Sequence, residues 1–381
     1  MVGRWQTGQS ELALVPRADI RGQTVLFGVV PRGPHEGVLS VSARDAEVWR
    51  GVYLPVATLE ATEAAVRYNN SDDSLELEVA GTRSLRFRRS GPVDMTALKQ
   101  ISIIGHRGLS LRRDPLMNSI AGIRQSWLFG CTGVELDVTI PYGDRREPMP
   151  RMPRVHHPPE WRSEITGFDS MAVSELRQAP DLEAALRASS DAGLPFVYLD
   201  PKLRWLVRRY PDEARISLEQ IVATASAHLA AGVRQTIAIG AETSGPGEAA
   251  DLLTTLRRER PWPNGLMWAL EVTRGTDTGN ALNRLMADNP GDRPDLVSLN
   301  LLRITGGGGG LLRLFVRPIS PEVEARFALS AQPVVFWTAY EERHFEGVLG
   351  AIRRLTPPGR EAGIITPHPH RLAFYLATYR P

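Results

Sequence analysis

The sequence is poor in cysteine, in lysine and in long apolar runs. Its single cysteine, Cys131, excludes an intramolecular disulfide and a metal centre built from several thiolates. No apolar stretch approaches the roughly 20 residues that cross a bilayer, and the opening segment MVGRWQTGQS lacks the apolar centre of a signal peptide. We therefore expect no transmembrane segment and, by default, a cytoplasmic protein.

The chain also carries little net charge. Its 381 residues have a formal net charge of +2 and are 42% hydrophobic and 23% charged, which is typical of a globular protein. This balance gives no sign of general affinity for nucleic acid or for a membrane surface. The length suits a barrel with an accessory domain better than one small domain, and the sequence carries no signal for an oligomeric state.

Lysine occurs at two positions, Lys99 and Lys202, whereas arginine is abundant. An ammonium group is a compact point charge on a flexible stem, and a guanidinium group is a planar fork. Because Lys202 is retained within VYLDPK, at the end of an apolar run, this position is expected to need an ammonium group.

Residues 1–95 are predicted to form a small antiparallel β domain. Leu75, Leu77 and Val79 alternate with polar residues, which is the pattern of a half-buried strand. Turn clusters such as RGPHEG and NNSDDS separate short runs of strand type, namely LALV, TVLFGVV, GVLSV, AAVRY, SLELEV and SLRFR. No cluster of acidic, basic or metal-ligating side chains suited to catalysis is apparent here, so we expect an accessory meander or half-barrel.

Residues 96–381 are predicted to form a (β/α)8 TIM barrel, which makes the chain an α/β protein. Helical segments such as DLEAALRASSDAG and HFEGVLGAIRRL alternate with eight apolar strand candidates: ISIIG, GVELDV, PFVYLD, TIAIG, LMWALEV, DLVSLNL, VVFWTA and GIIT. Eight such repeats match a fold of about 250 residues. An open doubly wound sheet is the alternative, but no glycine-rich dinucleotide turn follows the first strand.

The stretch Ile101–Val138 carries the most chemical information. It reads ISIIGHRG, then a helical segment, then GVELDV. Because side chains alternate along a strand, Glu135 and Asp137 project to one face of the second strand. Two adjacent carboxylates repel each other, and a hard cation makes the arrangement favourable. His106 and Arg107, at the end of the neighbouring strand, would complete a site for a phosphate ester.

Further polar residues are predicted at the C-terminal ends of the barrel strands, where residues of this fold tend to be catalytic. Asp200 and Lys202 end the third strand, and the insert after the second strand contains His156 and His157. Later strands end with Glu242, Glu271, Trp337 and Thr338. Carboxylates, basic groups and histidines are therefore expected to converge on one mouth of the barrel.

Several of these residues have a structural interpretation beside the functional one. His156 and His157 are adjacent, so only one of them faces the site in an extended chain, and the motif register favours His157. Trp337 is expected to pack in the barrel with one edge in the pocket. Glu242 and Glu271 are either site residues or partners in a helix cap or a salt bridge.

Two further features follow the ends of barrel strands and have no assigned role. Gly306–Gly310 follows the sixth strand and is predicted to be a flexible loop, because a glycine run holds no single conformation by itself. His368 and His370 lie in a proline-rich turn after the last strand and are expected to be exposed.

The motifs HRG, GVELDV, VHH, LDPK, FWTA and GIITPHP resemble the glycerophosphodiester phosphodiesterase superfamily over about Ile101 to Leu372. The resemblance implies a TIM barrel, a divalent cation and phosphodiester cleavage. It assigns catalytic roles to His106 and His157. It makes Glu135, Asp137 and Asp200 the metal ligands, and Arg107 and Lys202 the phosphate-binding residues, with Trp337 as a further candidate for substrate contact.

The chain departs from that family at three positions. Met117, before Asn118-Ser119, replaces a glutamate that is a metal ligand in the hydrolases; Pro158 replaces the aspartate after the second histidine; and Asp200 replaces the third-strand glutamate. The stretch NSIAGIRQSWLFGCTGVELDV also resembles the sphingomyelinase D and phospholipase D toxins, which share the first and third departures. The substrate therefore stays open between a glycerophosphodiester and a (lyso)phospholipid-like phosphodiester.

The sequence thus predicts a metal-dependent phosphodiesterase that uses one Mg²⁺ or Ca²⁺ and histidine acid–base catalysis. The attacking group is water or a substrate hydroxyl, which would give a cyclic phosphate, and either histidine can be the acid. A barrel that binds a phosphoester without turnover is the alternative from a different class, motivated by the replaced glutamate and aspartate.

Overall fold

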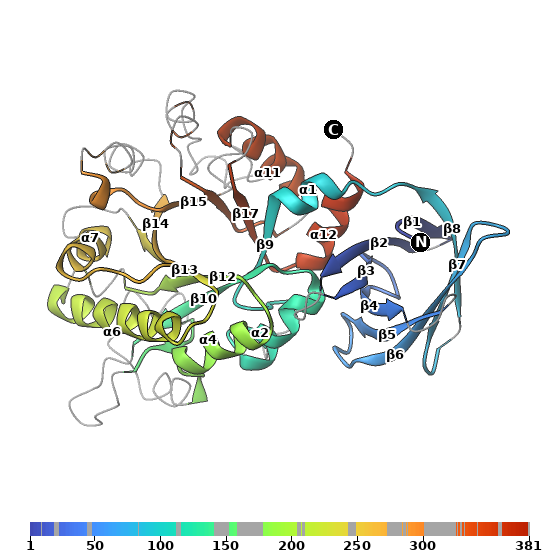
Figure 1. Cartoon of the computed structure of the whole chain (residues 1–381), viewed down its shortest axis with the longest axis horizontal. Coiled ribbons are helices and arrows are strands. Elements are labelled where there is room, and N and C mark those ends of the chain that lie inside the picture. The colour runs from blue at the N-terminus through green and yellow to red at the C-terminus, as the bar shows by residue number, and fades with distance from the viewer. Residues whose placement is uncertain are drawn as a thin grey trace, which may run out of the picture.

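The computed structural model contains two closed barrels joined by a short helix (Figure 1). This architecture confirms the predicted fold class, a TIM barrel with a small N-terminal all-β domain. Among the described residues, no helix is both long and apolar enough to span a bilayer. The description covers residues 1–8, 10–18, 23–43, 48–82, 84–111, 116–140, 152–157, 178–203, 207, 210–242, 249–272, 284, 287, 289–300, 325, 327, 330, 332–340, 342–356 and 360–379.

Eight antiparallel strands form the N-terminal barrel, and β1 closes it by pairing with both β2 and β8. The strands are β1 (Gly3–Thr7), β2 (Ser10–Ala18), β3 (Thr24–Val30), β4 (Gly37–Ala43), β5 (Val48–Pro55), β6 (Thr62–Asn69), β7 (Ser74–Val79) and β8 (Leu85–Gly91). The strands follow one another in the order of the expected meander, but the sheet closes into a full barrel and not a half-barrel. The six expected runs omit β1 and β5, in which glycine and arginine interrupt the apolar pattern, and these two strands allow the sheet to close.

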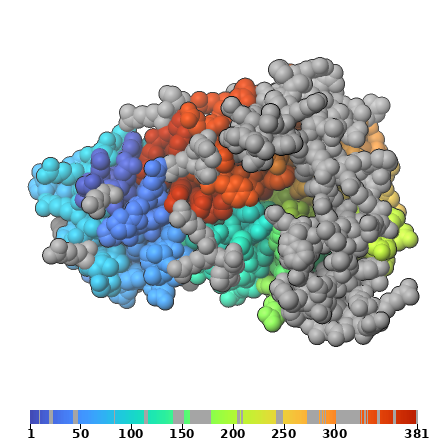
Figure 2. Space-filling view, turned by 180° about the vertical axis from the view of Figure 1, so that it is seen from behind, coloured from blue at the N-terminus to red at the C-terminus, as the bar shows by residue number. Residues whose placement is uncertain are grey.

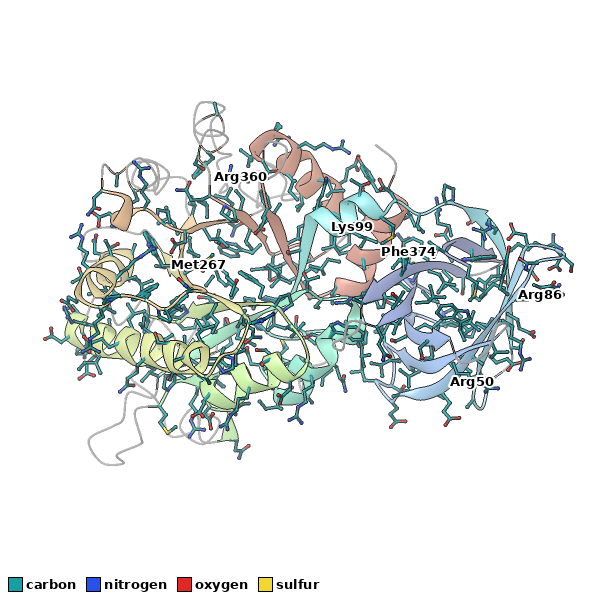
Figure 3. The ribbon with its side chains drawn as sticks, viewed as in Figure 1. Arg50, Arg86, Lys99, Met267, Arg360 and Phe374 are labelled. Atoms are coloured by element: carbon teal, nitrogen blue, oxygen red, sulfur yellow. The ribbon has the colours of Figure 1, made fainter. Side chains whose placement is uncertain are left out.

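The interior of the N-terminal barrel is filled by its own side chains. Trp5, Leu14, Val66, Leu75 and Phe87 are each 0% exposed and belong to one apolar cluster. An eight-stranded barrel is just wide enough for inward side chains to fill it. The lumen is therefore a packed core. The labelled Arg50 and Arg86 lie on the outer side of the barrel (Figure 3).

The helix α1 (Met95–Gln100) leads from the first barrel into the second. The Asp94 carboxylate caps it by accepting a hydrogen bond of 2.8 Å from the backbone N–H of Thr96. Lys99 is exposed on this helix (Figure 3). The predicted division between residues 95 and 96 falls at the first turn of α1 and stays a prediction.

Eight parallel strands form the second barrel, and β10 closes it by pairing with β9. They are β9 (Ile101–Gly105), β10 (Gly133–Thr139), β12 (Phe196–Pro201), β13 (Thr236–Glu242), β14 (Leu266–Val272), β15 (Leu296–Asn300), β16 (Val334–Trp337) and β17 (Ala362–Thr366). A short strand, β11 (Arg154–Val155), pairs antiparallel with the end of β10. The closure confirms the eight predicted strands and excludes the open doubly wound sheet.

Helices surround this barrel, and the main core lies between them and the strands. They are α2 (Ile120–Ser126) with the 3₁₀ turn η2 (Trp127–Phe129), α4 (Leu182–Asp191), α6 (Pro211–Ala230), α7 (Ala249–Glu259), η4 (Pro290–Asp292), α11 (Glu342–Leu355) and α12 (Pro369–Thr378). Leu186 of α4, Leu218 of α6 and Val197 of β12 are all 0% exposed in this core. The segment Gly306–Gly310 and Pro158 lie outside the described residues.

The N-terminal barrel packs against α12 and η2 of the second barrel, and Figure 2 shows the two in direct contact from behind. Phe27 and Val29 belong to the same apolar core as the barrel helices, and Phe374 of α12 lies at this junction (Figure 3). The Arg17 guanidinium donates to the carbonyl oxygens of Trp127 at 2.8 Å and of Cys131 at 2.5 Å. The two barrels therefore share a core.

His370 lies inside this junction and is 0% exposed, so the expectation that it is exposed is wrong. Its Nε2 lies 2.9 Å from the Glu36 carboxylate of the N-terminal barrel, which also accepts a bond of 2.8 Å from Arg371. His368 is half-buried as well. The sequence gives no sign that the first barrel covers the start of α12, because these contacts join residues 334 and 335 positions apart.

We predict that Glu36→Ala lowers the unfolding free energy at pH 7 by about 1–3 kcal/mol, because buried donors lose their acceptor. Burial acts to raise the pKa of Glu36, but the hydrogen bonds from His370 and Arg371 outweigh it and lower the pKa to about 2. The stabilisation is therefore complete above the ordinary value of 4.5 and is lost as the pH falls toward 2.

Urea unfolding at pH 7, 5 and 3 checks this, with the exposed Glu60→Ala as the control that should change stability by less than about 0.5 kcal/mol. The Glu36→Ala penalty should be similar at pH 7 and 5 and smaller at pH 3. An equal penalty at all three pH values would contradict the assignment of the lowered pKa.

Candidate functional site

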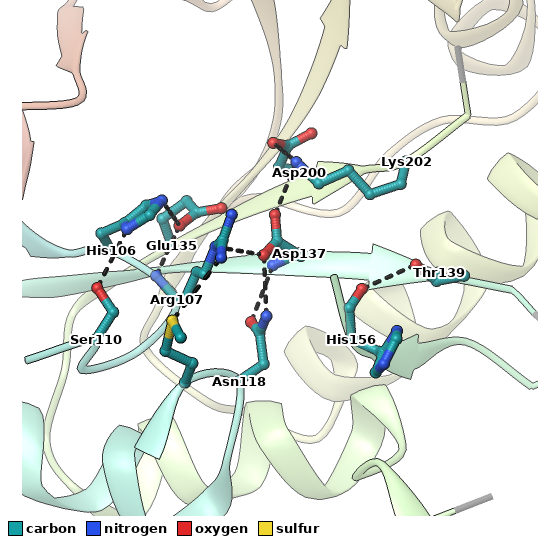
Figure 4. A network of polar contacts seen from close by, with 11 residues as sticks. His106, Arg107, Ser110, Asn118, Glu135, Asp137, Thr139, His156, Asp200 and Lys202 are labelled. Atoms are coloured by element: carbon teal, nitrogen blue, oxygen red, sulfur yellow. Dashed lines mark hydrogen bonds and ion pairs between the residues drawn. The ribbon is translucent and has the colours of Figure 1, made fainter. Parts of the chain in front are cut away.

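Three carboxylates meet at the C-terminal ends of β10 and β12 (Figure 4). Glu135 and Asp137 lie two residues apart on β10, and the parallel register with β12 places Asp200 directly beside Asp137. One ligand oxygen of each residue lies within 4.8 Å of the other two. Glu135 and Asp137 are 4% and 1% exposed, whereas Asp200 is half-buried. The structure thus brings together the three carboxylates that the sequence singled out.

Asp137 is the centre of the polar network. Its Oδ1 lies 2.7 Å from Lys202 Nζ, and its Oδ2 lies 3.1 Å from Arg107 Nε. The Asn118 amide donates to the same Oδ2 at 2.9 Å and accepts a bond of 3.2 Å from the backbone N–H of Asp137. Lys202 also bonds to Asp200. Two cations and one amide therefore fix a single buried carboxylate.

The HRG turn after β9 is tied to β10 through its backbone. The Arg107 N–H donates to Glu135 Oε2 at 2.7 Å, and the Gly108 N–H donates to the Glu135 carbonyl oxygen at 2.8 Å. Arg107 and Gly108 have φ values of 53° and 77°. Two successive left-handed residues make the chain turn sharply, and glycine at the second position removes part of the steric cost. The turn therefore directs His106 and Arg107 toward the carboxylates.

The charges of the site act strongly on one another. Burial, followed by the charges of Asp137 and Asp200, raises the pKa of Glu135 well above its usual range. Burial acts in the same direction on Asp137, but Lys202, His157 and Arg107 outweigh it and lower the pKa of Asp137. Burial acts to lower the pKa of Lys202, yet Asp200, Asp137 and Glu135 raise it. The pair on β10 is therefore asymmetric, because the pKa of Glu135 is raised while that of Asp137 is lowered.

His106 lies beside this cluster at the end of β9. Its Nε2 is 4.0 Å from Glu135 Oε2, its Nδ1 is 3.2 Å from the Ser110 hydroxyl, and its backbone N–H donates to the Thr366 carbonyl oxygen at 3.0 Å. Burial lowers the pKa of His106 to about 3, against the opposing charge of Asp137. The imidazole is therefore neutral at pH 7 and has a nitrogen able to accept a proton.

The two adjacent histidines follow β11. The backbone of His156 is bound to β10, because its N–H donates to the Asp137 carbonyl oxygen at 3.0 Å and its carbonyl oxygen accepts from Thr139 at 2.8 Å. Figure 4 shows the His156 ring turned away from the carboxylates. His157 lies within electrostatic reach of the cluster: burial lowers its pKa and Asp137 acts to raise it.

Other predicted residues are separate from the carboxylate cluster. Glu271 is 6% exposed inside the barrel, where it accepts a hydrogen bond of 2.7 Å from the Tyr198 hydroxyl. Trp337 packs, half-buried, against the apolar cluster that fills the barrel interior, and Thr338 follows it at the end of β16. The side chain of Glu242 lies outside the described part of the structure.

Sequence reasoning missed two polar residues that hold the site. Asn118 binds Asp137 on two sides, and Ser110 binds the His106 ring. Met117, which stands in place of a glutamate of the resembled hydrolases, has its sulfur 3.8 Å from Arg107 Nη1. The NS pair after Met117 marked Asn118 as a motif position, but no signal in the sequence distinguished Ser110.

Comparison with known proteins finds no matching family model and no matching curated protein. Similar solved structures include a glycerophosphodiester phosphodiesterase from Parabacteroides distasonis, at 14% identity and TM-score 0.46 over 73% of this chain and 97% of that one. The glycerophosphoryl diester phosphodiesterase domain of a Mycobacterium tuberculosis protein matches at 17% identity and TM-score 0.42, over 72% of this chain and 99% of that one. Haloferax volcanii malate synthase, as a magnesium–glyoxylate complex, matches at 11% identity and TM-score 0.41, over 74% of this chain and 76% of that one.

The first two structures belong to the superfamily that the motifs resemble. Their identities are below 20% and their TM-scores below 0.5, and a malate synthase matches with a similar score. These likenesses therefore carry no weight for the function, for which the site geometry is the evidence.

We predict that Lys202→Met destabilises the metal-free protein by about 3 kcal/mol, the lower end for breaking a buried ion pair. The Lys202 side chain is 23% exposed between Asp137 and Asp200, and its loss removes one of the cations that offset the repulsion among the carboxylates. Thermal and urea unfolding in excess EDTA measures the effect. Lys99→Met, at the other lysine of the chain, is the matched control on the surface. Equal stability of the two variants would contradict this role for Lys202.

Proposed function

We propose that this protein is a metal-dependent phosphodiesterase that acts on a glycerophosphodiester or a (lyso)phospholipid-like phosphodiester. The observation that supports the proposal is the convergence of Glu135, Asp137 and Asp200 within 4.8 Å, with Lys202 and Arg107 bound to Asp137. Burying several carboxylates side by side costs free energy unless bound cations offset their charge, and such clusters are found mainly at functional sites. A cation and a phosphate anion together match the negative and positive groups of this cluster.

The donor set fits a hard divalent cation. All three ligands are carboxylates, which suit Mg²⁺ or Ca²⁺, and the single thiol, Cys131, is buried at the barrel junction beside Arg17. A cation held by Glu135, Asp137 and Asp200 would supply Lewis-acid stabilisation of a non-bridging phosphate oxygen. Burial, and then repulsion from Asp137 and Asp200, raises the pKa of Glu135, and such a cation would relieve that repulsion.

Arg107 and Lys202 are the proposed phosphate-binding groups. Their side chains are 21% and 23% exposed, so both cations reach the open side of a cluster whose carboxylates are mostly buried. Cations that are already fixed in place stabilise the charge that grows on the phosphoryl oxygens in the transition state. The guanidinium group offers a planar fork and the ammonium group a point charge, so the two recognise different oxygens.

His106 and His157 are the proposed acid and base. One imidazole takes the proton of the attacking hydroxyl group, and the other gives a proton to the leaving alcohol. The attacking group is water in a hydrolase and a substrate hydroxyl in an enzyme that forms a cyclic phosphate. We propose Trp337, at the end of β16, as a further contact for the substrate.

We predict that turnover of glycerophosphodiesters or lysophospholipids ceases in EDTA and returns with Mg²⁺ or Ca²⁺. Phosphorus NMR of the products separates a phosphomonoester from a cyclic phosphate. Asp137→Asn should lose turnover at every metal concentration, and Glu259→Gln, an exposed carboxylate of α7, is the control that should retain it. Full activity in chelator would contradict metal catalysis. Metal binding without turnover of any diester would instead favour the non-catalytic phosphoester-binding barrel.

We also predict that His106→Ala and His157→Ala each lower kcat by about 10²–10⁴-fold, the usual contribution of a general acid or base. The double variant should lose far less than the product of the two effects, because the groups act as a unit. His156→Ala is the adjacent control and should retain most activity, since its ring points away from the cluster. An inactive His156→Ala beside an active His157→Ala would reverse the assignment.

A further inference from the structure

We propose that Ser110 is a positioning residue for His106, and that its hydroxyl group fixes the orientation of the imidazole ring. The Ser110 Oγ lies 3.2 Å from Nδ1, while Nε2 on the other side of the ring lies 4.0 Å from Glu135 Oε2 (Figure 4). The consequence for turnover rests on the proposed function, whereas the consequence for the ring itself does not.

The two ring nitrogens of His106 have different surroundings. Nδ1 faces a neutral hydroxyl group, and Nε2 faces the carboxylate cluster where the substrate would bind. A hydrogen bond at Nδ1 restricts the rotation of the ring and thereby sets the direction in which Nε2 points. Ser110 therefore determines where Nε2 lies relative to the carboxylates.

The backbone holds the Ser110 hydroxyl rigidly. Its neighbours Leu109 and Leu111 are 0% and 2% exposed, and Ser110 itself is 9% exposed. The Leu109 N–H donates to the Arg107 carbonyl oxygen at 3.0 Å, which closes the tight turn that returns residue 110 beneath residue 106. Two apolar anchors and a closed turn thus leave the hydroxyl group little freedom to move away from the ring.

A hydroxyl group suits this task better than a carboxylate or an amide. It can donate to a bare Nδ1 or accept from a protonated one, so it keeps one ring orientation through both halves of a proton-transfer cycle. It adds no negative charge to a cluster that already contains three carboxylates. Threonine would preserve this function, and alanine would remove it.

A second contact limits the ring on its open side. The Tyr340 ring meets the imidazole edge-to-face, with centroids 6.1 Å apart and planes at 79°. Tyr340 is 49% exposed, so this contact alone cannot fix the ring in one position. The buried hydrogen bond to Ser110 is therefore the main side-chain restraint on the ring at Nδ1.

The kinetic test compares Ser110→Ala, Ser110→Thr and Ser126→Ala. Ser110→Ala should lower kcat by about 10–100-fold with little change in KM, because a misplaced catalytic group costs rate rather than affinity. Ser110→Thr should recover most of the rate. Ser126→Ala removes another buried hydroxyl group from α2, where Ser126 donates to the Ile123 carbonyl oxygen, and should leave kcat unchanged. Thermal unfolding confirms that each variant is folded.

The decisive readout is the position of the His106 ring in crystals of the wild-type protein, Ser110→Ala and Ser110→Thr. The wild-type protein and Ser110→Thr should show one ring position, with Nδ1 toward residue 110 and Nε2 toward Glu135, and Ser110→Ala should show a rotated ring or several positions. An unchanged single ring position in Ser110→Ala, or a changed position with unchanged kcat, overturns the proposal. If the wild-type protein turns over no phosphodiester, the proposed function fails, while the comparison of ring positions still decides whether Ser110 fixes the ring.

Discussion

The repulsion among three carboxylates at one end of the second barrel is the constraint on which the site depends. Glu135, Asp137 and Asp200 lie within 4.8 Å of one another, and two of them are almost completely buried. Burial and mutual repulsion both penalise the charged forms, so the arrangement persists only because fixed cations offset the cost. Lys202 and Arg107 perform this task in the metal-free protein.

This constraint explains the local structure around the site. The HRG turn adopts left-handed backbone conformations that give the Arg107 N–H to Glu135 and the Arg107 side chain to Asp137. Asn118, also at a positive φ of 53°, closes the opposite side of Asp137. Such backbone strain is sustained only where the surroundings over-determine it, and it clusters at functional sites. Two segments with left-handed residues thus hold the carboxylate of Asp137.

The parts of the site that follow from strand periodicity could be predicted from the sequence. The E-x-D alternation places Glu135 and Asp137 on one face, and the DPK end of the third strand brings Asp200 and Lys202 beside them. Parallel strands of a barrel end at one mouth, so the convergence followed from the fold class. The metal, the substrate and the roles of the histidines stay predictions, because no sequence pattern measures chemistry directly.

The parts that depend on contacts between distant segments could not be predicted. Closure of the N-terminal barrel depends on β1 and β5, whose apolar pattern is weak. The burial of His370 depends on Glu36, a residue from the other barrel. Ser110 binds His106 through a turn whose shape is set by two left-handed residues rather than by a hydrophobic period. In each case tertiary packing determines the structure, and the local sequence contains little information about that packing.

Anomalous diffraction from crystals of the full chain soaked in Mn²⁺ tests the central claim most directly, because Mn²⁺ accepts the same oxygen ligands as Mg²⁺. The account predicts one strong anomalous peak in contact with oxygen atoms of Glu135, Asp137 and Asp200, and no such peak in crystals of Asp137→Asn. A wild-type crystal in which these carboxylates bind no ion, while Mn²⁺ binds at other acidic residues such as Asp72 and Asp73, would contradict it.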